Sequence, residues 1–159
     1  MSRAFVKEQD DAPEDLTERP VSAGPNVVTP HGLKLIDAEI EAGRRILAQG
    51  QHEGDKSAIA RASRDLRYWV QRRATAQVIE MPDRPETVAF GTRVTILRDD
   101  GRKQVFAIVG EDESDPPKGY LTYTSPLARA LMGRAVGDAV EIPGGEAEIV
   151  KLEAIGPEG

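Results

Sequence analysis

The region from Thr29 to Ala76 constrains the fold most, because two segments in it share one apolar spacing. Successive steps of three and four residues separate the seam positions in each segment: Leu33, Ile36, Ile40, Gly43 and Leu47 in the first, and Ile59, Ala62, Leu66, Trp69, Arg73 and Ala76 in the second. This heptad spacing is typical of a narrow seam that faces a single partner helix. Residues 49–55, between the segments, include Gly50 and Gly54 and no apolar residue, which indicates a turn. The sequence therefore predicts an antiparallel helical hairpin.

Local signals predict where both helices begin and end. Thr29 is a good N-cap and Pro30 suits the first helical position, so we expect the first helix over residues 30–48. Asp55 is the expected N-cap of the second helix, which we expect to end within residues 77–80, ahead of Pro82.

The hairpin, at residues 29–80, divides the chain into further regions. Residues 1–28 are acidic and poor in apolar side chains, so we expect a mobile tail. Residues 81–86 hold two prolines and predict a linker. Residues 87–159 alternate short strand patterns with turn signals, and Ser125 begins a short helix. The predicted class is α+β: a helical hairpin followed by a small antiparallel β-sheet domain with one short helix.

Charge is spread unevenly along the chain, whose formal net charge is −6. The second predicted helix is strongly basic, with Asp65 as its acidic residue against Lys56, Arg61, Arg64, Arg67, Arg72 and Arg73. Such a face could meet phosphate groups or an acidic protein channel. Alternatively, the long arginine side chains cover the seam around Leu66 and Trp69 and keep their charged ends in water. The sequence leaves both interpretations open.

Several kinds of site are excluded or disfavoured by composition. The chain has no cysteine, which rules out disulfides and thiolate metal sites, and it has no apolar run long enough to span a membrane. It has no signal peptide pattern either, so we expect a cytoplasmic protein. His31 and His52 have no third ligand at metal-binding spacing. The acidic loop at residues 111–115 lacks the EF-hand pattern and is expected to be solvated.

Two motifs resemble the GreA/GreB transcription elongation factors. One is Val28-Thr29-Pro30-His31-Gly32-Leu33 at the start of the hairpin, and the other runs Ser125-Pro126-Leu127-Ala128-Arg129-Ala130-Leu131-Met132-Gly133, followed by Val136-Gly137-Asp138. The turn Pro143-Gly144-Gly145 also fits the end of that family's C-terminal domain. The resemblance covers about residues 28–155.

The resemblance implies a fold and a partner. The C-terminal domain would be FKBP-like and would dock at the rim of the secondary channel of bacterial RNA polymerase, with Thr124, Ser125 and Pro126 at the docking surface. The hairpin would enter that channel. No cofactor, membrane contact or sequence-specific DNA binding is expected, and the protein would act as a monomer that is not itself an enzyme.

The resemblance also implies where chemistry would occur, at the hairpin tip formed by Glu53, Asp55, Lys56 and Ser57. In the family, an Asp and a Glu at this tip help to hold a metal ion inside the polymerase, where water attacks backtracked RNA. Asp55 matches the family's Asp and is the candidate Mg²⁺ ligand acting in trans, but Ala58 and Ile59 replace the family's Glu and Asn. The coil is also about ten residues shorter than the family's, a feature shared with the Gre-related regulator of nucleoside diphosphate kinase.

Three functions therefore stay open. The first is a polymerase-binding regulator with little or no stimulation of RNA cleavage. The second is an active cleavage factor that uses Asp55 and, as a second carboxylate, Glu53. The third is an FKBP-like prolyl isomerase, which the low aromatic content disfavours. A DNA-binding module is disfavoured by the overall acidic charge.

Overall fold

The computed structural model describes residues 16–81 and 83–156, which form two compact units. The first unit contains residues 16–23 and 37–74, and the second contains residues 24–36 and 75–156 with the gap at Pro82. The first long helix continues from one unit into the other.

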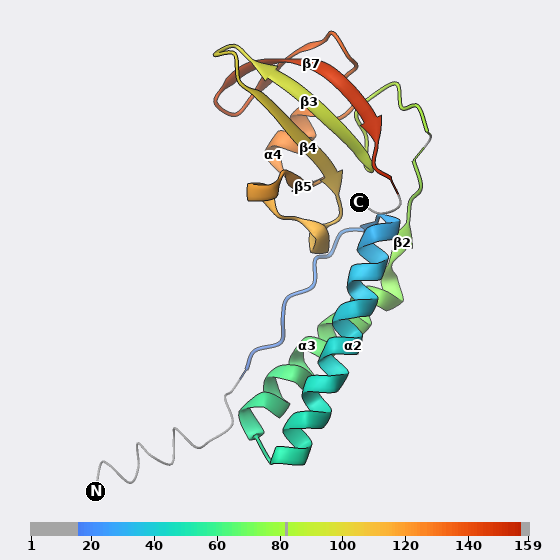
Figure 1. The fold of residues 1–159 in the computed structure, drawn as a ribbon, viewed down its shortest axis with the longest axis vertical. Helices are drawn as coiled ribbons and strands as arrows, with labels where there is room; N and C mark the ends of the chain where they lie inside the picture. The colour runs from blue at the N-terminus through green and yellow to red at the C-terminus, as the bar shows by residue number, and fades with distance from the viewer. Residues whose placement is uncertain (1–15, 82, 157–159) are drawn as a thin grey trace, which may run out of the picture. The chain divides into compact units, whose positions relative to one another are not determined.

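The first unit is built on a pair of antiparallel helices, α2 (Pro30–Glu53) and α3 (Lys56–Thr75) (Figure 1). Ile40 and Ala62 of the predicted seam are buried. Leu66 packs so closely on Gly43 that a Cβ added there would lie 3.0 Å from its side chain. The predicted hairpin is therefore confirmed, as are Pro30 as the first residue of α2 and Asp55 as the residue before α3.

The turn of the hairpin is shorter than predicted, because α2 continues past Ala48 to Glu53. Gly50 does not break the helix but provides room for α3, since a Cβ at this position would lie 3.2 Å from Cγ1 of Ile59. The chain reverses instead at Gly54, whose φ of +70° is a conformation that suits glycine. The Asp55 amide then donates to the Gly50 carbonyl at 2.9 Å, which closes the turn.

The predicted end of α3 is also wrong, because the helix stops at Thr75. Gln77–Val78 form strand β2, which pairs in parallel with β1 (Val27–Val28). The amides of Gln77 and Ile79 donate to the carbonyls of Asn26 and Val28 at 2.8 and 3.0 Å. Because these two amides bond to carbonyls of an extended segment, continuing α3 as a helix would break the pairing of β1 with β2. The segment before the hairpin is thus part of a small sheet in the second unit.

The second unit is dominated by a five-stranded sheet with the order β5-β4-β3-β7-β6 (Figure 1). Its strands are β3 (Thr92–Arg98), β4 (Lys103–Val109), β5 (Tyr120–Thr122), β6 (Ala139–Ile142) and β7 (Gly145–Ala154). Most pairs are antiparallel, as predicted, but β5 runs parallel to β4 and makes the sheet mixed. The parallel pairing follows from the connection between them, which contains two short 3-10 helices, η1 (Glu111–Glu113) and η2 (Pro116–Lys118).

One short helix, α4 (Pro126–Leu131), packs its buried Ala128 and Leu131 into the core of the sheet. The core side chains come from every strand of the five-stranded sheet and include Val94, Ile96, Ile108, Leu121, Val140 and Ile149. This arrangement confirms the predicted α+β class. No helix in the described part of the chain is both long and apolar enough to cross a bilayer.

Candidate functional site

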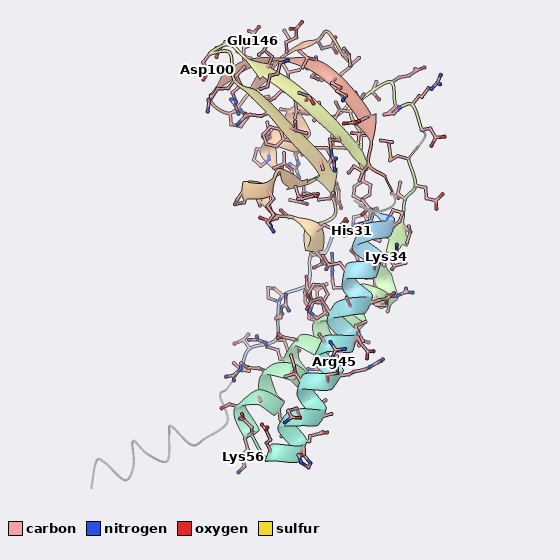
Figure 2. All side chains as sticks on the ribbon, viewed as in Figure 1. His31, Lys34, Arg45, Lys56, Asp100 and Glu146 are labelled. Carbon is pink, nitrogen blue, oxygen red and sulfur yellow. The ribbon has the colours of Figure 1, made fainter. Side chains whose placement is uncertain are left out.

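The hairpin tip places the predicted residues Glu53, Asp55, Lys56 and Ser57 together in the first unit. Glu53, Asp55 and Lys56 are exposed, and Ser57 is half-buried. Figure 2 shows Lys56 at the turn of the hairpin. The tip is therefore a polar surface that a partner can reach from outside.

Asp55 is occupied in part by capping α3. Its Oδ1 accepts a hydrogen bond from the Ala58 amide at 3.1 Å, which satisfies one of the free donors at the start of the helix. A carboxylate in this position is also favoured by the helix dipole. The predicted N-cap is therefore confirmed, and one face of the carboxylate is engaged within the protein.

Glu53 ends the other helix, and its carboxylate accepts from the Gln49 amide side chain at 2.5 Å. Ala58, on the first turn of α3, contributes a methyl group and no oxygen ligand. Among the described residues, no group of three or more His, Asp and Glu side chains is arranged to hold a metal ion. The tip thus presents Asp55, which Lys56 follows in the sequence, and Glu53 at the end of the preceding helix.

The predicted docking residues Thr124, Ser125 and Pro126 lie together in the second unit at the start of α4. Ser125 Oγ accepts from the Ala128 amide at 3.2 Å, so Ser125 is the N-cap of the helix. Thr124 Oγ1 lies 3.2 Å from Oγ1 of Thr122, and Pro126 is exposed at the first helical position. These residues form a rigid surface, because the cap and the proline both fix the local backbone.

A buried carboxylate that the sequence did not reveal fixes the start of α2 within the second unit. Glu113 was expected in a solvated acidic loop, but it is only 9% exposed. Its Oε2 accepts from the amides of Thr29 and Gly110, each at 3.2 Å, and its Oε1 accepts from the Thr29 hydroxyl. The prediction of a solvated side chain is therefore wrong for this residue.

The same cluster explains the Thr-Pro-His-Gly sequence at the start of the helix. Thr29 Oγ1 accepts from the Gly32 amide at 3.0 Å, which confirms Thr29 as the N-cap of α2. A side chain at Gly32 would overlap the Glu113 carboxyl group. We call Thr29, Gly32, Gly110 and Glu113 the carboxylate clamp. A threonine cap followed by a glycine in the first turn of the helix was the available sequence signal, but nothing in the sequence linked it to a residue 84 positions away.

Helix α3 differs from the predicted face of solvated arginines at one position, Arg72. Arg72 is buried, only 2% exposed, with its guanidinium carbon 6.0 Å from the centre of the Tyr68 ring. Arg67 and Arg73, by contrast, are exposed and form ion pairs with Glu18 and Asp37. The basic helix therefore combines one buried arginine with exposed ones.

Comparison with known proteins finds related sequences. Residues 82–156 match the family model for the C-terminal domain of the GreA/GreB transcription elongation factors. The chain is 32% identical to transcription elongation factor GreA of Phenylobacterium zucineum over 150 residues, covering 79% of this chain and 96% of that protein. GreA of Bradyrhizobium is 49% identical over 73 residues, covering 43% of this chain and 46% of that protein.

A solved structure is similar as well. The GreA homologue Gfh1 of Thermus thermophilus covers 82% of this chain and all of its own length, at 19% identity and a TM-score of 0.40. The sequence match with the Phenylobacterium protein spans nearly all of that relative and most of this chain. This chain therefore belongs to the GreA/GreB family of transcription elongation factors.

Proposed function

We propose that the protein is a regulator that binds bacterial RNA polymerase, inserts its hairpin into the secondary channel, and stimulates RNA cleavage little or not at all. It would act on the polymerase in the cytoplasm and would not be an enzyme itself. The observation that carries the proposal is the tip, where Asp55 caps α3 and Ala58 stands in place of a second carboxylate.

The chemistry of a bound metal ion supports this proposal. Hydrolysis of RNA by two metal ions requires the second ion to be held by oxygen ligands beside the attacking water. Asp55 supplies one carboxylate, and the neighbouring ammonium group of Lys56 repels a cation. Glu53 belongs to the end of α2 and accepts a hydrogen bond from Gln49 within that helix. The tip is therefore poorly suited to holding a second metal ion.

The length of the hairpin points the same way. The match to the Phenylobacterium protein is 150 positions long but contains only 79% of the 159 residues of this chain, so the relative carries residues in this span that the chain lacks. Helix α2 has 24 residues, which corresponds to a length of about 36 Å. We infer that the missing residues shorten the coil and limit how deeply the tip reaches.

Docking would use the second unit. We infer that Thr124, Ser125 and Pro126 contact the polymerase, because the half-buried cap and the exposed proline form a fixed surface at the start of α4. The match of residues 82–156 to the family model supports this assignment of the docking function to the C-terminal part of the chain.

The proposal is tested by measuring RNA cleavage in backtracked elongation complexes with the native protein and with Asp55→Ala. Binding to core polymerase is measured in parallel. We expect binding without an increase in cleavage above the intrinsic rate of the polymerase, and no effect of Asp55→Ala on that rate.

Two results would contradict the proposal in different ways. Cleavage that depends on Asp55 would identify an active cleavage factor that needs only one matched carboxylate. Failure of the native protein to bind polymerase would remove the polymerase from the proposal altogether. Ser125→Asn provides a docking control, because asparagine keeps a capping oxygen while changing the surface.

A further inference from the structure

Residues 16–23 form an extended segment that lies on helix α3 within the first unit, and we call this segment the strap. Glu18 and Arg67 are joined by a forked ion pair, with Arg67 Nε 2.9 and 3.0 Å from the two carboxylate oxygens and Nη2 2.5 Å from one of them. Arg19 Nη1 lies 3.5 Å from Asp65 Oδ1. The strap is thus attached to α3 by one residue of each charge.

The aromatic residues of α3 complete this attachment. Tyr68 and Trp69 meet edge to face, with ring centres 5.0 Å apart. The guanidinium carbon of Arg19 lies 4.0 Å from the centre of the Tyr68 ring and 5.3 Å from that of Trp69, which is cation–π distance. The strap therefore covers both an arginine and the aromatic pair on one stretch of the basic helix.

Covering this stretch changes what the hairpin presents to a partner. Without the strap, Arg64, Arg67 and the two rings would form a positively charged face with aromatic groups. With the strap in place, Glu18 neutralises Arg67 and Arg19 occupies the rings. The charged side chains of this face are Arg64 and Arg67 against Asp65, which pairs with Arg64 at 3.0 Å, and this excess of positive charge favours an acidic surface as the partner.

The attachment is of a kind that a partner can displace. The side chains of Arg67 and Glu18 are 57% and 61% exposed, and those of Arg19 and Asp65 are 35% and 38% exposed. Ion pairs between such exposed groups contribute little stability and are screened by salt. A competing acidic surface can therefore replace the strap without unfolding the hairpin.

We propose that the strap is a built-in competitor, which covers the arginine and aromatic face of α3 and must leave before that face docks on an acidic protein surface of the polymerase channel. This inference rests on the proposed function and adds regulation to it. A strap that is closed about nine-tenths of the time would weaken the apparent affinity for polymerase about tenfold.

The test compares Glu18→Lys/Arg19→Ala with Thr17→Lys in the full-length protein. Both variants raise the net charge by the same amount, but Thr17 is exposed and its substitution leaves the two attaching side chains in place. Affinity for core polymerase is measured for each variant and for the native protein. The emission of Trp69, the one tryptophan of the chain, reports whether the strap has left the ring.

We expect Glu18→Lys/Arg19→Ala to bind polymerase about threefold to tenfold more tightly than Thr17→Lys, with Trp69 emission shifted to longer wavelength. Equal affinity of the two variants, or weaker binding by the double variant, would overturn the inference while leaving the proposed function intact. If none of the three proteins binds polymerase, the proposed function fails and the inference fails with it. Preferential binding of the double variant to a single-stranded RNA probe, with unchanged affinity for polymerase, would assign the face to nucleic acid instead.

Discussion

Two glutamates connect the N-terminal part of this chain to other elements, and they do so in opposite ways. Glu113 is buried and accepts hydrogen bonds from three donors in the carboxylate clamp. Glu18 is exposed and pairs with the single guanidinium of Arg67. Removing a buried carboxylate that has all its hydrogen-bond partners is costly, because each donor is left buried without an acceptor and cannot bond to water instead. An exposed ion pair exchanges easily with solvent. The first contact suits a permanent anchor, and the second suits a contact that is made and broken.

Replacement of Glu113 by alanine should have the largest effect. It would leave the Thr29 amide, the Thr29 hydroxyl and the Gly110 amide without their acceptor in a buried site. We expect the free energy of unfolding to fall by about 3 kcal/mol. The measurement is urea denaturation followed by circular dichroism. The exposed Glu86→Ala is the control and should change the value by less than about 0.5 kcal/mol. Equal losses in both variants would show that the clamp is not an anchor.

Gly32→Ala tests the space that the clamp needs. Alanine in place of glycine normally stabilises a helix interior by up to about 1 kcal/mol. Here the added methyl group would overlap the Glu113 carboxyl group, so we expect a loss of about 1–3 kcal/mol instead. The check is a double-mutant cycle, because the loss should disappear in the Glu113→Ala background. A loss that persists without the carboxyl group would place the clash elsewhere.

The effect of Ser125→Ala on the free energy of unfolding should lie between the effects of losing the Glu113 contacts and the Glu18 contact. The Ser125 hydroxyl is half-buried and satisfies one amide at the start of α4. We expect a loss of about 1 kcal/mol in the free energy of unfolding, and Ser125→Asn should recover most of it. Thermal denaturation of both variants tests this. If Ser125→Asn is as stable as the native protein but binds polymerase more weakly, docking and capping are separate roles of this residue.

Loss of the strap contact should have the smallest effect on stability, and the contact itself should depend on pH. The hydrogen bond from Arg67 is the main reason that the pKa of Glu18 lies below its ordinary value of 4.5. Because the pKa is lowered in the folded protein, the contact is fully present above pH 4.5 and is lost as the pH falls through the lowered value. Trp69 emission should therefore shift in this acidic range, and Glu18→Gln should abolish the shift. A shift that survives in Glu18→Gln would have to come from another group.

The sequence predicted the parts of the fold that depend on neighbouring residues. The seam spacing predicted the hairpin, and the local caps Thr29, Asp55 and Ser125 all have the predicted partners within three residues. The failures involve distant partners. The local pattern indicates a turn at Gly50. The real role of this glycine, which is to give room to Ile59 of the other helix, cannot be predicted from neighbouring residues.

The candidate site shows the same difference between local and long-range interactions. The tip residues are contiguous in sequence, so their proximity could be predicted. Glu113 could not be distinguished from its acidic neighbours, because its role depends on Thr29, which lies 84 positions away. Likewise, the acidic composition of the N-terminal segment did not indicate that Glu18 and Arg19 find partners of opposite charge on α3. The expectation of a mobile tail stays a prediction, and residues 1–15 of that tail lie outside the described residues. Burial and long-range pairing decide these roles, and neither is visible in a local pattern.

RNA cleavage in backtracked elongation complexes, measured with Ala58→Glu, Ala58→Gln and the native protein, tests whether the missing carboxylate keeps this protein from stimulating cleavage. Position 58 is on the first turn of α3, where glutamate is well tolerated, and the Asp55 amide is already bonded to the Gly50 carbonyl, so the new carboxylate would be available to a metal ion. We predict that the native protein and Ala58→Gln leave cleavage at the intrinsic rate, whereas Ala58→Glu raises it. Stimulation of cleavage by the native protein would contradict the proposal of a non-cleaving regulator. Identical rates with Ala58→Glu and Ala58→Gln, when both bind polymerase, would show that the length of the coil limits cleavage and not the missing carboxylate.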